Sequence, residues 1–419
     1  MTPIFYQTIH RLREAISCEL NQTADCGQEI DFLNWMGRAA LELIGQGGLG
    51  YSFDPLVANT ENTFGDALKA LMFVYPFHLS YRHFLAARAI AFCLTTPRKL
   101  GPPRLRRFLI SLVPDVDIQE LRQIVDIVAD RSKEILDGKR KALEDGDEAV
   151  NMQVGEGKDI MSILLRQNMK IEDSEKLPEH ELLAQMSTFV FAATDTTSNA
   201  LARIFDLLAQ HQHVQDKLRQ EILESCDSED GTFTDLSYDK LVELPYLDAV
   251  CRETLRLYPP VSFVTREAER DIVLPLSEPI QGVDGTPMKE ILVPNGTTVI
   301  IGIRACNRNK AIWGEDALEW KPDRWLDSVP GSVKEARVPG IYANLMTFLG
   351  GGRACIGFKF SQLEMKVVLA VLLHSFKFLP SSKGIVWNFA GISYPTVSPV
   401  DKKPSMPMRI EPIFRNVVV

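Results

Sequence analysis

The stretch Phe348-Leu349-Gly350-Gly351-Gly352-Arg353-Ala354-Cys355-Ile356-Gly357 decides the fold of this 419-residue chain. It runs directly into residues 358–369, whose apolar spacing predicts a helix. A thiolate at the N-terminus of that helix would be stabilised by the helix dipole and by free N–H groups. The glycines would let a flat ligand approach the sulfur, and Arg353 suits a carboxylate. Taken alone, the same residues also fit a Gly-rich loop with an ordinary buried cysteine.

The pattern Phe-x-x-Gly-x-Arg-x-Cys-x-Gly is matched in full by Phe348, Gly351, Arg353, Cys355 and Gly357. It resembles the haem-binding loop of the cytochrome P-450 family. The resemblance implies that the cofactor is heme b (iron protoporphyrin IX) and that Cys355 ligates its iron. It also implies that Arg353 contacts a haem propionate, and that Phe348, Gly351 and Gly357 shape the cofactor site under the sulfur.

Composition and charge limit the other possibilities. The chain is 45 % apolar and 24 % charged, as is ordinary for a globular protein, and its net charge of −9 leaves no basic footprint for nucleic acid. The seven cysteines are scattered, odd in number and never spaced as C-x-x-C. This pattern argues for a reducing compartment and against a disulfide framework or a structural zinc. The best apolar run, Val367–Leu373, is about seven residues long, whereas a membrane span needs about 20.

The first half of the chain carries helical patterns. Amphipathic helices are predicted over residues 5–20 and 32–43, the second closed by the Gly45-Gln46-Gly47-Gly48 cluster. The apolar segment 62–96, broken at Pro76, fits either two core helices with a loop or a lid over a substrate cavity. A long helix around 118–135, a solvated loop over 139–157 and a short helix over 158–165 are expected next.

A helix of about 30 residues, roughly 45 Å long, is predicted from Pro178 to Leu208. At its middle, Ala192-Ala193-Thr194-Asp195-Thr196-Thr197 opposes helix propensity, which indicates either a kinked, inert core helix or a site. The segment is similar to the central helix of the cytochrome P-450 family. The resemblance implies that Asp195 and Thr196 organise water and supply protons for the oxygen chemistry at the haem. Ala193 replaces the usual glycine, so we expect tuned rather than lost activity.

Glu253 and Arg256 are i,i+3 neighbours, a spacing that most often marks an ordinary exposed pair. In the family the corresponding Glu-x-x-Arg pair is joined by a later arginine, here Arg324 of Trp320-Lys321-Pro322-Asp323-Arg324-Trp325. The resemblance implies a buried triad that locks the fold around the haem loop, because one orphaned buried charge would cost several kcal/mol. It also implies that Arg266 binds the second propionate, although Arg266 equally fits a surface arginine on a strand.

Residues 261–264 and the stretch 272–303 are predicted to form short strands. By resemblance we expect Val261, Phe263, Val264 and Phe389 to contact substrate. Lys359 and Lys366 either help to dock an acidic reductase face or are ordinary solvated lysines.

Together these patterns predict one domain over residues 1–419, mainly α with a small β region. It would be helix-rich over 1–258, with small strands over 259–303, the haem loop and last helix over 340–379, and strands and turns over 380–419. The resemblance, closest to the fungal microsomal type, implies a cytochrome P-450 fold lacking its N-terminal strands and first helices.

The implied function is a haem-thiolate monooxygenase that inserts one oxygen atom from O2 into a lipophilic small molecule. The resemblance implies a role in secondary metabolism. Electrons would come from an NADPH-dependent cytochrome P-450 reductase. The family location is the cytosolic face of the endoplasmic reticulum membrane, whereas the missing anchor suggests the cytoplasm. Two alternatives stay open: a truncated remnant with weak or no haem binding, and a family member that rearranges oxygenated substrates without O2.

Overall fold

The computed structural model describes residues 1–21, 29–54, 56–57, 101–172, 174–226, 233–327, 329–401 and 403–413. The apolar segment 62–96, predicted as core helices or a lid, lies outside the described residues. The fold is mainly helical with small antiparallel sheets, as the sequence predicts.

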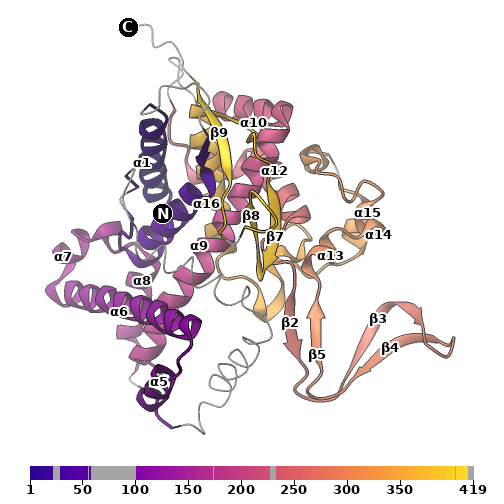
Figure 1. The fold of residues 1–419 in the computed structure, drawn as a ribbon, viewed down its shortest axis with the longest axis horizontal. Helices are drawn as coiled ribbons and strands as arrows, with labels where there is room; N and C mark the ends of the chain where they lie inside the picture. The colour runs from indigo at the N-terminus through magenta and orange to yellow at the C-terminus, as the bar shows by residue number, and fades with distance from the viewer. Residues whose placement is uncertain are drawn as a thin grey trace.

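The long central helix is α9, Glu179–Gln210, which runs through the middle of the molecule (Figure 1). Pro178 precedes it, and Glu179 and Glu181 lie in its first turn, where negative charge complements the helix dipole. The second half of α9 is almost wholly buried. It packs against α2 (Phe32–Leu43), α10 (Gln212–Ser225), α12 (Pro245–Leu257) and α16 (Phe358–Ser375).

Two apolar clusters form the core of the described part of the chain, and α9 contributes to both. The larger cluster contains Phe32 of α2, Phe205 of α9 and Phe378, whose ring centroids lie 4.5 to 5.3 Å apart. The smaller cluster contains Leu182 and Met186 from the first half of α9. The helix therefore ties together two groups of apolar side chains along its length.

The N-terminal helices are α1, Thr2–Asn21, and α2, as predicted. The glycine cluster does not close α2, contrary to expectation, because the chain continues as a π-helical segment, η1, over Ile44–Leu49. A side chain at Gly47 would lie 2.9 Å from the ring of Phe5, so this glycine admits a neighbour instead of breaking the helix. The helix ends at Gly50, whose φ of 58° suits glycine.

The predicted solvated loop over residues 139–157 is wrong. Helix α6 extends over Val116–Asp145 and is followed by α7 (Asp147–Asn151), η2 (Val154–Gly157) and α8 (Ile160–Lys170). Lys139 is buried and its Nζ lies 2.8 Å from Asp159 Oδ2 and 2.9 Å from Ser162 Oγ. Because this charge is paired inside the fold, a charged stretch is structured where composition alone suggests a solvated loop.

The short strands expected over residues 272–303 form as far as Ile301, and the strands of the described chain pair in antiparallel fashion. One sheet has the order β1-β9-β6, from Glu29–Asp31, Pro407–Pro412 and Phe376–Leu379. The others are pairs: β2 (Val264–Glu267) with β5 (Thr298–Ile301), β3 (Ile272–Gln281) with β4 (Pro287–Val293), and β7 (Val386–Ala390) with β8 (Ile392–Thr396). The β3–β4 pair projects from the body as an arm (Figure 1). Val261 and Phe263 precede β2, so the predicted strand begins later than expected.

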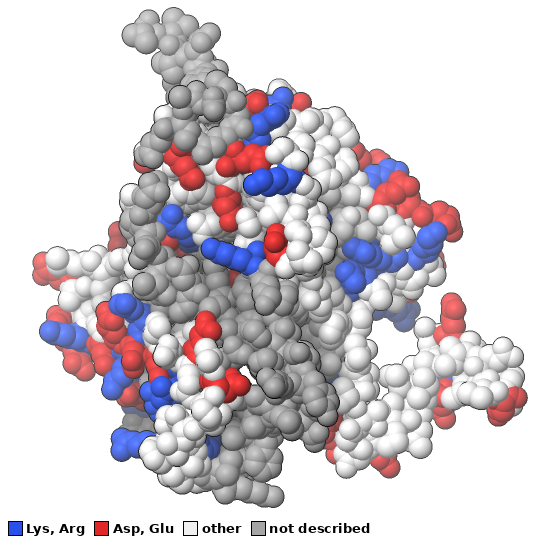
Figure 2. Space-filling model, in the orientation of Figure 1, with Lys and Arg blue, Asp and Glu red and all other residues white. Residues whose placement is uncertain are grey.

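Shorter elements complete the described chain. They are α5 (Pro103–Ser111), α11 (Tyr238–Glu243), α13 (Ile303–Asn307), α14 (Lys310–Trp313), η3 (Pro322–Trp325), α15 (Gly331–Glu335), η4 (Met346–Phe348) and η5 (Gly351–Arg353). Within the described ranges, no helix is both long and apolar enough to traverse a bilayer. On the face drawn in Figure 2, acidic and basic side chains intermingle.

Candidate functional site

The Cys355 loop is built from two short helical turns, η4 and η5, ahead of α16. The backbone N–H of Cys355 donates a 2.9 Å hydrogen bond to Phe348 O, which closes the loop. A Cβ at Gly350 would lie 2.0 Å from Pro339 O, and Gly351 has a φ of 64°. The loop therefore needs glycine at both positions, one for close backbone approach and one for backbone conformation.

The Cys355 side chain is exposed beside the first turn of α16. Partial burial raises the pKa of its thiol, and a hydrogen bond from the Gly357 backbone opposes this rise. Cys251, by contrast, is fully enclosed, and burial raises its thiol pKa to about 12. Among the described cysteines, Cys355 thus combines accessibility with a position at a helix start, as the sequence predicts.

The surroundings of Cys355 fit a haem group. Within the described ranges, no three His, Cys, Asp or Glu side chains gather as a metal site. A Cβ at Gly351 or Gly352 would meet nothing within 4 Å, which leaves open space on this segment. Arg353 and Arg266 are exposed, and in the described part of the chain neither has a carboxylate partner. An accessible thiol, an open glycine segment and the exposed Arg353 two residues from the thiol fit a metal, a flat ring and a propionate.

The middle of α9 stays helical because its hydroxyl groups bond back to the helix. Thr194 Oγ1 donates to Val190 O at 2.8 Å, and Thr196 Oγ1 donates to Ala192 O at 2.7 Å. Thr194 is buried, whereas Asp195 and Thr196 are partly exposed. A hydroxyl bonded to a carbonyl can rotate to another acceptor, so Thr196 is available to an adjacent water or ligand.

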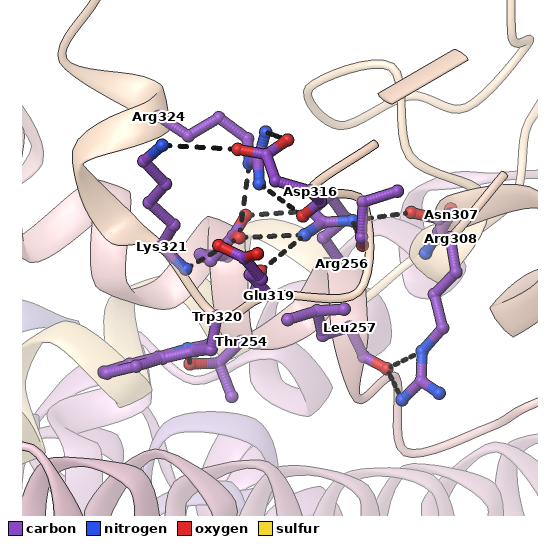
Figure 3. A network of polar contacts seen from close by, with 12 residues as sticks. Thr254, Arg256, Leu257, Asn307, Arg308, Asp316, Glu319, Trp320, Lys321 and Arg324 are labelled. Atoms are coloured by element: carbon purple, nitrogen blue, oxygen red, sulfur yellow. Dashed lines mark hydrogen bonds and ion pairs between the residues drawn. The ribbon is translucent and has the colours of Figure 1, made fainter. Parts of the chain in front are cut away.

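Glu253, Arg256 and Arg324 come together in a buried network (Figure 3). Arg256 binds Glu253 in bidentate fashion, with Nη2 2.8 Å from Oε1 and Nε 2.9 Å from Oε2. Arg324 Nε lies 3.3 Å from Glu253 Oε1, and its Nη1 lies 2.8 Å from Asp316 Oδ1. The Arg324 guanidinium holds the pKa of the Asp316 carboxyl below its usual range. Asp316 is a partner that no pattern in the sequence indicated.

The network reaches the Cys355 loop through Asn307. Arg256 Nη1 donates to Asn307 O at 3.1 Å. The Asn307 side chain donates to Thr347 Oγ1 at 2.8 Å and accepts a 2.8 Å hydrogen bond from Met346 N. Thr347 in turn donates to Leu255 O at 2.8 Å. These bonds connect the buried charges to η4, the turn that ends at Phe348.

The candidate substrate contacts Phe263 and Phe389 lie together, with ring centroids 5.5 Å apart. Both rings are about two-fifths exposed, at 43 % and 40 %. Val261 and Val264 are half-buried nearby in the chain. The pair offers an accessible aromatic surface at the junction of β2 and β7.

Lys366 is neither part of a docking surface nor a solvated lysine, so both interpretations of this residue are wrong. Its side chain is buried, with Nζ 2.9 Å from Asp248 Oδ1 and 3.1 Å from Val242 O. It therefore neutralises a carboxylate inside the fold instead of meeting a partner. Lys359 is exposed beside the ring of Phe358.

Glu364 on α16 is a buried titratable group that sequence reasoning missed. It is fully buried, and neither carboxylate oxygen has a hydrogen-bond partner among the described residues. Burial raises the pKa of this carboxyl well above its usual range. The only sequence signal was an acidic residue just ahead of the apolar run 367–373.

The comparisons with known proteins agree on one family. The cytochrome P450 family model matches residues 1–392. Cytochrome P450 monooxygenase 91 of Postia placenta is 56 % identical over 411 residues, 98 % of this chain and 73 % of that relative. Ganoderic acid synthetase CYP5150L8 of Ganoderma lucidum is 48 % identical over 409 residues, 97 % of this chain and 73 % of that protein. The crystal structure of a cytochrome P450, CYP102L1, superposes with a TM-score of 0.66 at 23 % identity, covering 98 % of this chain and 73 % of that one.

Proposed function

Because this chain belongs to the cytochrome P450 family, we propose that it inserts one oxygen atom from O2 into a lipophilic small molecule, using iron protoporphyrin IX ligated by Cys355. The observation that carries the proposal is the accessible Cys355 thiol on a glycine loop connected to a buried charge network. Membership of the family supports a monooxygenase with a haem cofactor. The roles proposed below for single residues rest on the positions of those residues in the structure.

Haem bound at Cys355 would supply the redox chemistry, with Cys355 as its thiolate ligand. Cys355 must lose its proton on ligation, because only the thiolate binds metal. Arg266 and Arg353 would each bind one propionate. Phe348 packs against Tyr342 and Phe358, with centroids 5.5 and 6.1 Å away, and so keeps the loop in place.

Asp195 and Thr196 would handle protons. Thr196 would turn its hydroxyl from Ala192 O toward a water, and Asp195 is the titratable group one residue away. A hydrogen-bonded chain of this kind lets a proton pass from solvent to the reacting atoms.

The substrate would lie against Phe263 and Phe389, whose exposed rings favour an apolar body. The 48 % identical Ganoderic acid synthetase supports a role in secondary metabolism. The substrate can be identified by testing candidate lipophilic compounds for turnover. Loss of turnover in Phe263→Ala and Phe389→Ala, with the haem retained, would support these contacts, whereas unchanged KM and kcat would argue against them.

Electrons would come from an NADPH-dependent cytochrome P450 reductase, and Lys359 offers an exposed cation near the Cys355 loop. Lys359→Glu should slow reduction by the reductase but not by dithionite; equal slowing with both would contradict a docking role.

We place the protein at the cytosolic face of the endoplasmic reticulum membrane. Helix α5 supports a position at a membrane surface, since it exposes Leu105, Phe108 and Leu109 beside Arg104 and Arg106. Sedimentation with anionic vesicles should be lost in Phe108→Asp, and binding that does not depend on this position would contradict the placement.

The decisive experiment is a reduced-plus-CO difference spectrum of the purified chain. A thiolate-type Soret band that disappears in Cys355→Ala supports the proposal. A histidine-type band, or haem-free protein after reconstitution, would favour a chain that does not function as a monooxygenase. Cys18→Ala is the matched control, because Cys18 is exposed on α1, outside the loop.

A further inference from the structure

A cavity of about 90 Å³ lies between α9, the segment after α12, α13 and the β7–β8 hairpin. A water occupies about 10–15 Å³ on this measure, so the space holds several waters or one small polar group. Its lining residues are Asn199, Arg203, Tyr258, Pro259, Pro260, Arg304, Arg308, Trp387, Asn388, Phe389 and Ser393. They include three arginines and no Asp or Glu, so the cavity is cationic.

Arg203 is fixed in the wall of the cavity. Its guanidinium lies 3.6 Å from the ring centroid of Trp387 and 4.3 Å from that of Tyr258. Its Nη1 is 3.6 Å from Asp206 Oδ2, which also accepts a 2.9 Å hydrogen bond from Trp387 Nε1. Burial lowers the pKa of Arg203 to about 10, which leaves it charged at neutral pH. Asp206 therefore offsets one of the three cations.

Among the described residues, the other two cations have no carboxylate partner. Arg308 donates to Leu257 O (Figure 3). Its guanidinium also lies 5.1 Å from the ring centroid of Tyr258. Burial and the neighbouring Arg304 both lower the pKa of Arg308, so the two guanidinium groups repel each other. Arg304 is exposed and makes no hydrogen bond or ion pair through its side chain with the described residues. An anion between them would relieve this repulsion.

Two further features point to a polar occupant beside an apolar surface. Asn199 is 8 % exposed, its Nδ2 donates to Asp195 O at 2.8 Å, and its Oδ1 has no partner in the described chain. A buried acceptor of this kind requires a donor, which a water or hydroxyl in the cavity would supply. Phe389 lines the cavity and also contacts Phe263. The charged cavity thus adjoins the aromatic pair.

We infer that this cavity binds the carboxylate of a lipophilic acid whose hydrocarbon body lies against Phe389 and Phe263. The inference rests on the proposed function, because it places the acid in the same substrate site. A carboxylate fits a fork of two guanidinium groups, whereas the cavity is too small for the apolar body itself.

Calorimetric titration of the full chain with octanoate and with octanamide tests the inference, since the two probes differ in charge but hardly in size. Octanoate should bind more tightly, and added salt should reduce this preference. Arg304→Gln should weaken octanoate binding about fivefold, as expected for an exposed ion pair. Arg304→Glu should weaken it further, and octanamide binding should not change. Arg270→Gln, which alters an exposed arginine outside the cavity, is the matched control.

Equal affinity for the two probes, or an octanoate preference that survives in Arg304→Glu, would overturn the inference. Because Arg304 is exposed, both variants should keep the unfolding profile of the wild type. The CO spectrum separates this result from the proposed function. A charge-dependent preference without a thiolate-type band would support the carboxylate site while refuting the monooxygenase.

Discussion

Glu364 gives the sharpest test of the energetics of this fold. The carboxyl is fully buried on α16, and both of its oxygens lack partners among the described residues. Burial raises its pKa in the folded protein, so the folded state keeps a proton that the unfolded chain has already released. The unfolded state therefore binds fewer protons above its ordinary carboxyl pKa, and the free energy of unfolding falls as pH rises toward the folded pKa.

The expected slope is about 1.4 kcal/mol per pH unit for one such group. Glu364→Gln removes the titration while keeping the size of the side chain. As pH rises from the ordinary carboxyl pKa toward the raised pKa of folded Glu364, the stability of the variant should therefore increase relative to the wild type at this slope. The contribution is fully present at acidic pH and is lost as pH rises, which is opposite to the behaviour of a salt-bridged carboxylate.

Urea unfolding, followed by circular dichroism at a series of pH values, measures this difference directly. Burial also raises the pKa of Glu42 and Glu221, so the wild type alone does not isolate Glu364, whereas the difference between wild type and variant does. Glu290→Gln, on the exposed strand β4, is the control and should follow the wild type. Parallel curves for wild type and Glu364→Gln would refute the reasoning.

Three further changes test the site. Thr196→Ala should keep the haem but divert reducing equivalents from product to hydrogen peroxide; unchanged coupling between NADPH use and product would show that the hydroxyl is structural. Glu253→Gln should destabilise the fold by about 3–5 kcal/mol, because it leaves two buried guanidinium groups short of a carboxylate, whereas Glu315→Gln at the surface should change the urea midpoint little. Asn307→Ala removes both side-chain bonds to η4, so haem should dissociate faster to apomyoglobin; a wild-type rate would argue against a link from the charge network to the loop.

Much of the architecture followed from local pattern. The apolar period predicted α9 nearly to its ends, and the turn residues predicted the strands over 272–303. The family pattern predicted which charges meet around Glu253, because its spacing encodes a contact that composition does not.

The failures share a physical cause, which is pairing across long distances in the chain. Lys139 and Lys366 look like solvated lysines until Asp159 and Asp248 are placed beside them inside the fold. The bond between Asn307 and Thr347 likewise spans 40 residues, and neither residue type marks it in advance. A buried ion pair is a property of the folded arrangement, so a local reading of charge cannot find it.

Helix α9 is a single rod whose two halves belong to different apolar clusters. Asp195 and Thr196 sit near the changeover, between Val190 of one cluster and Ala200 of the other. Unfolding of either apolar cluster would remove the packing around one half of α9, so we expect the two clusters to unfold cooperatively. Backbone amides near Asp195 and Thr196 should then exchange their hydrogens with solvent only when the whole domain unfolds.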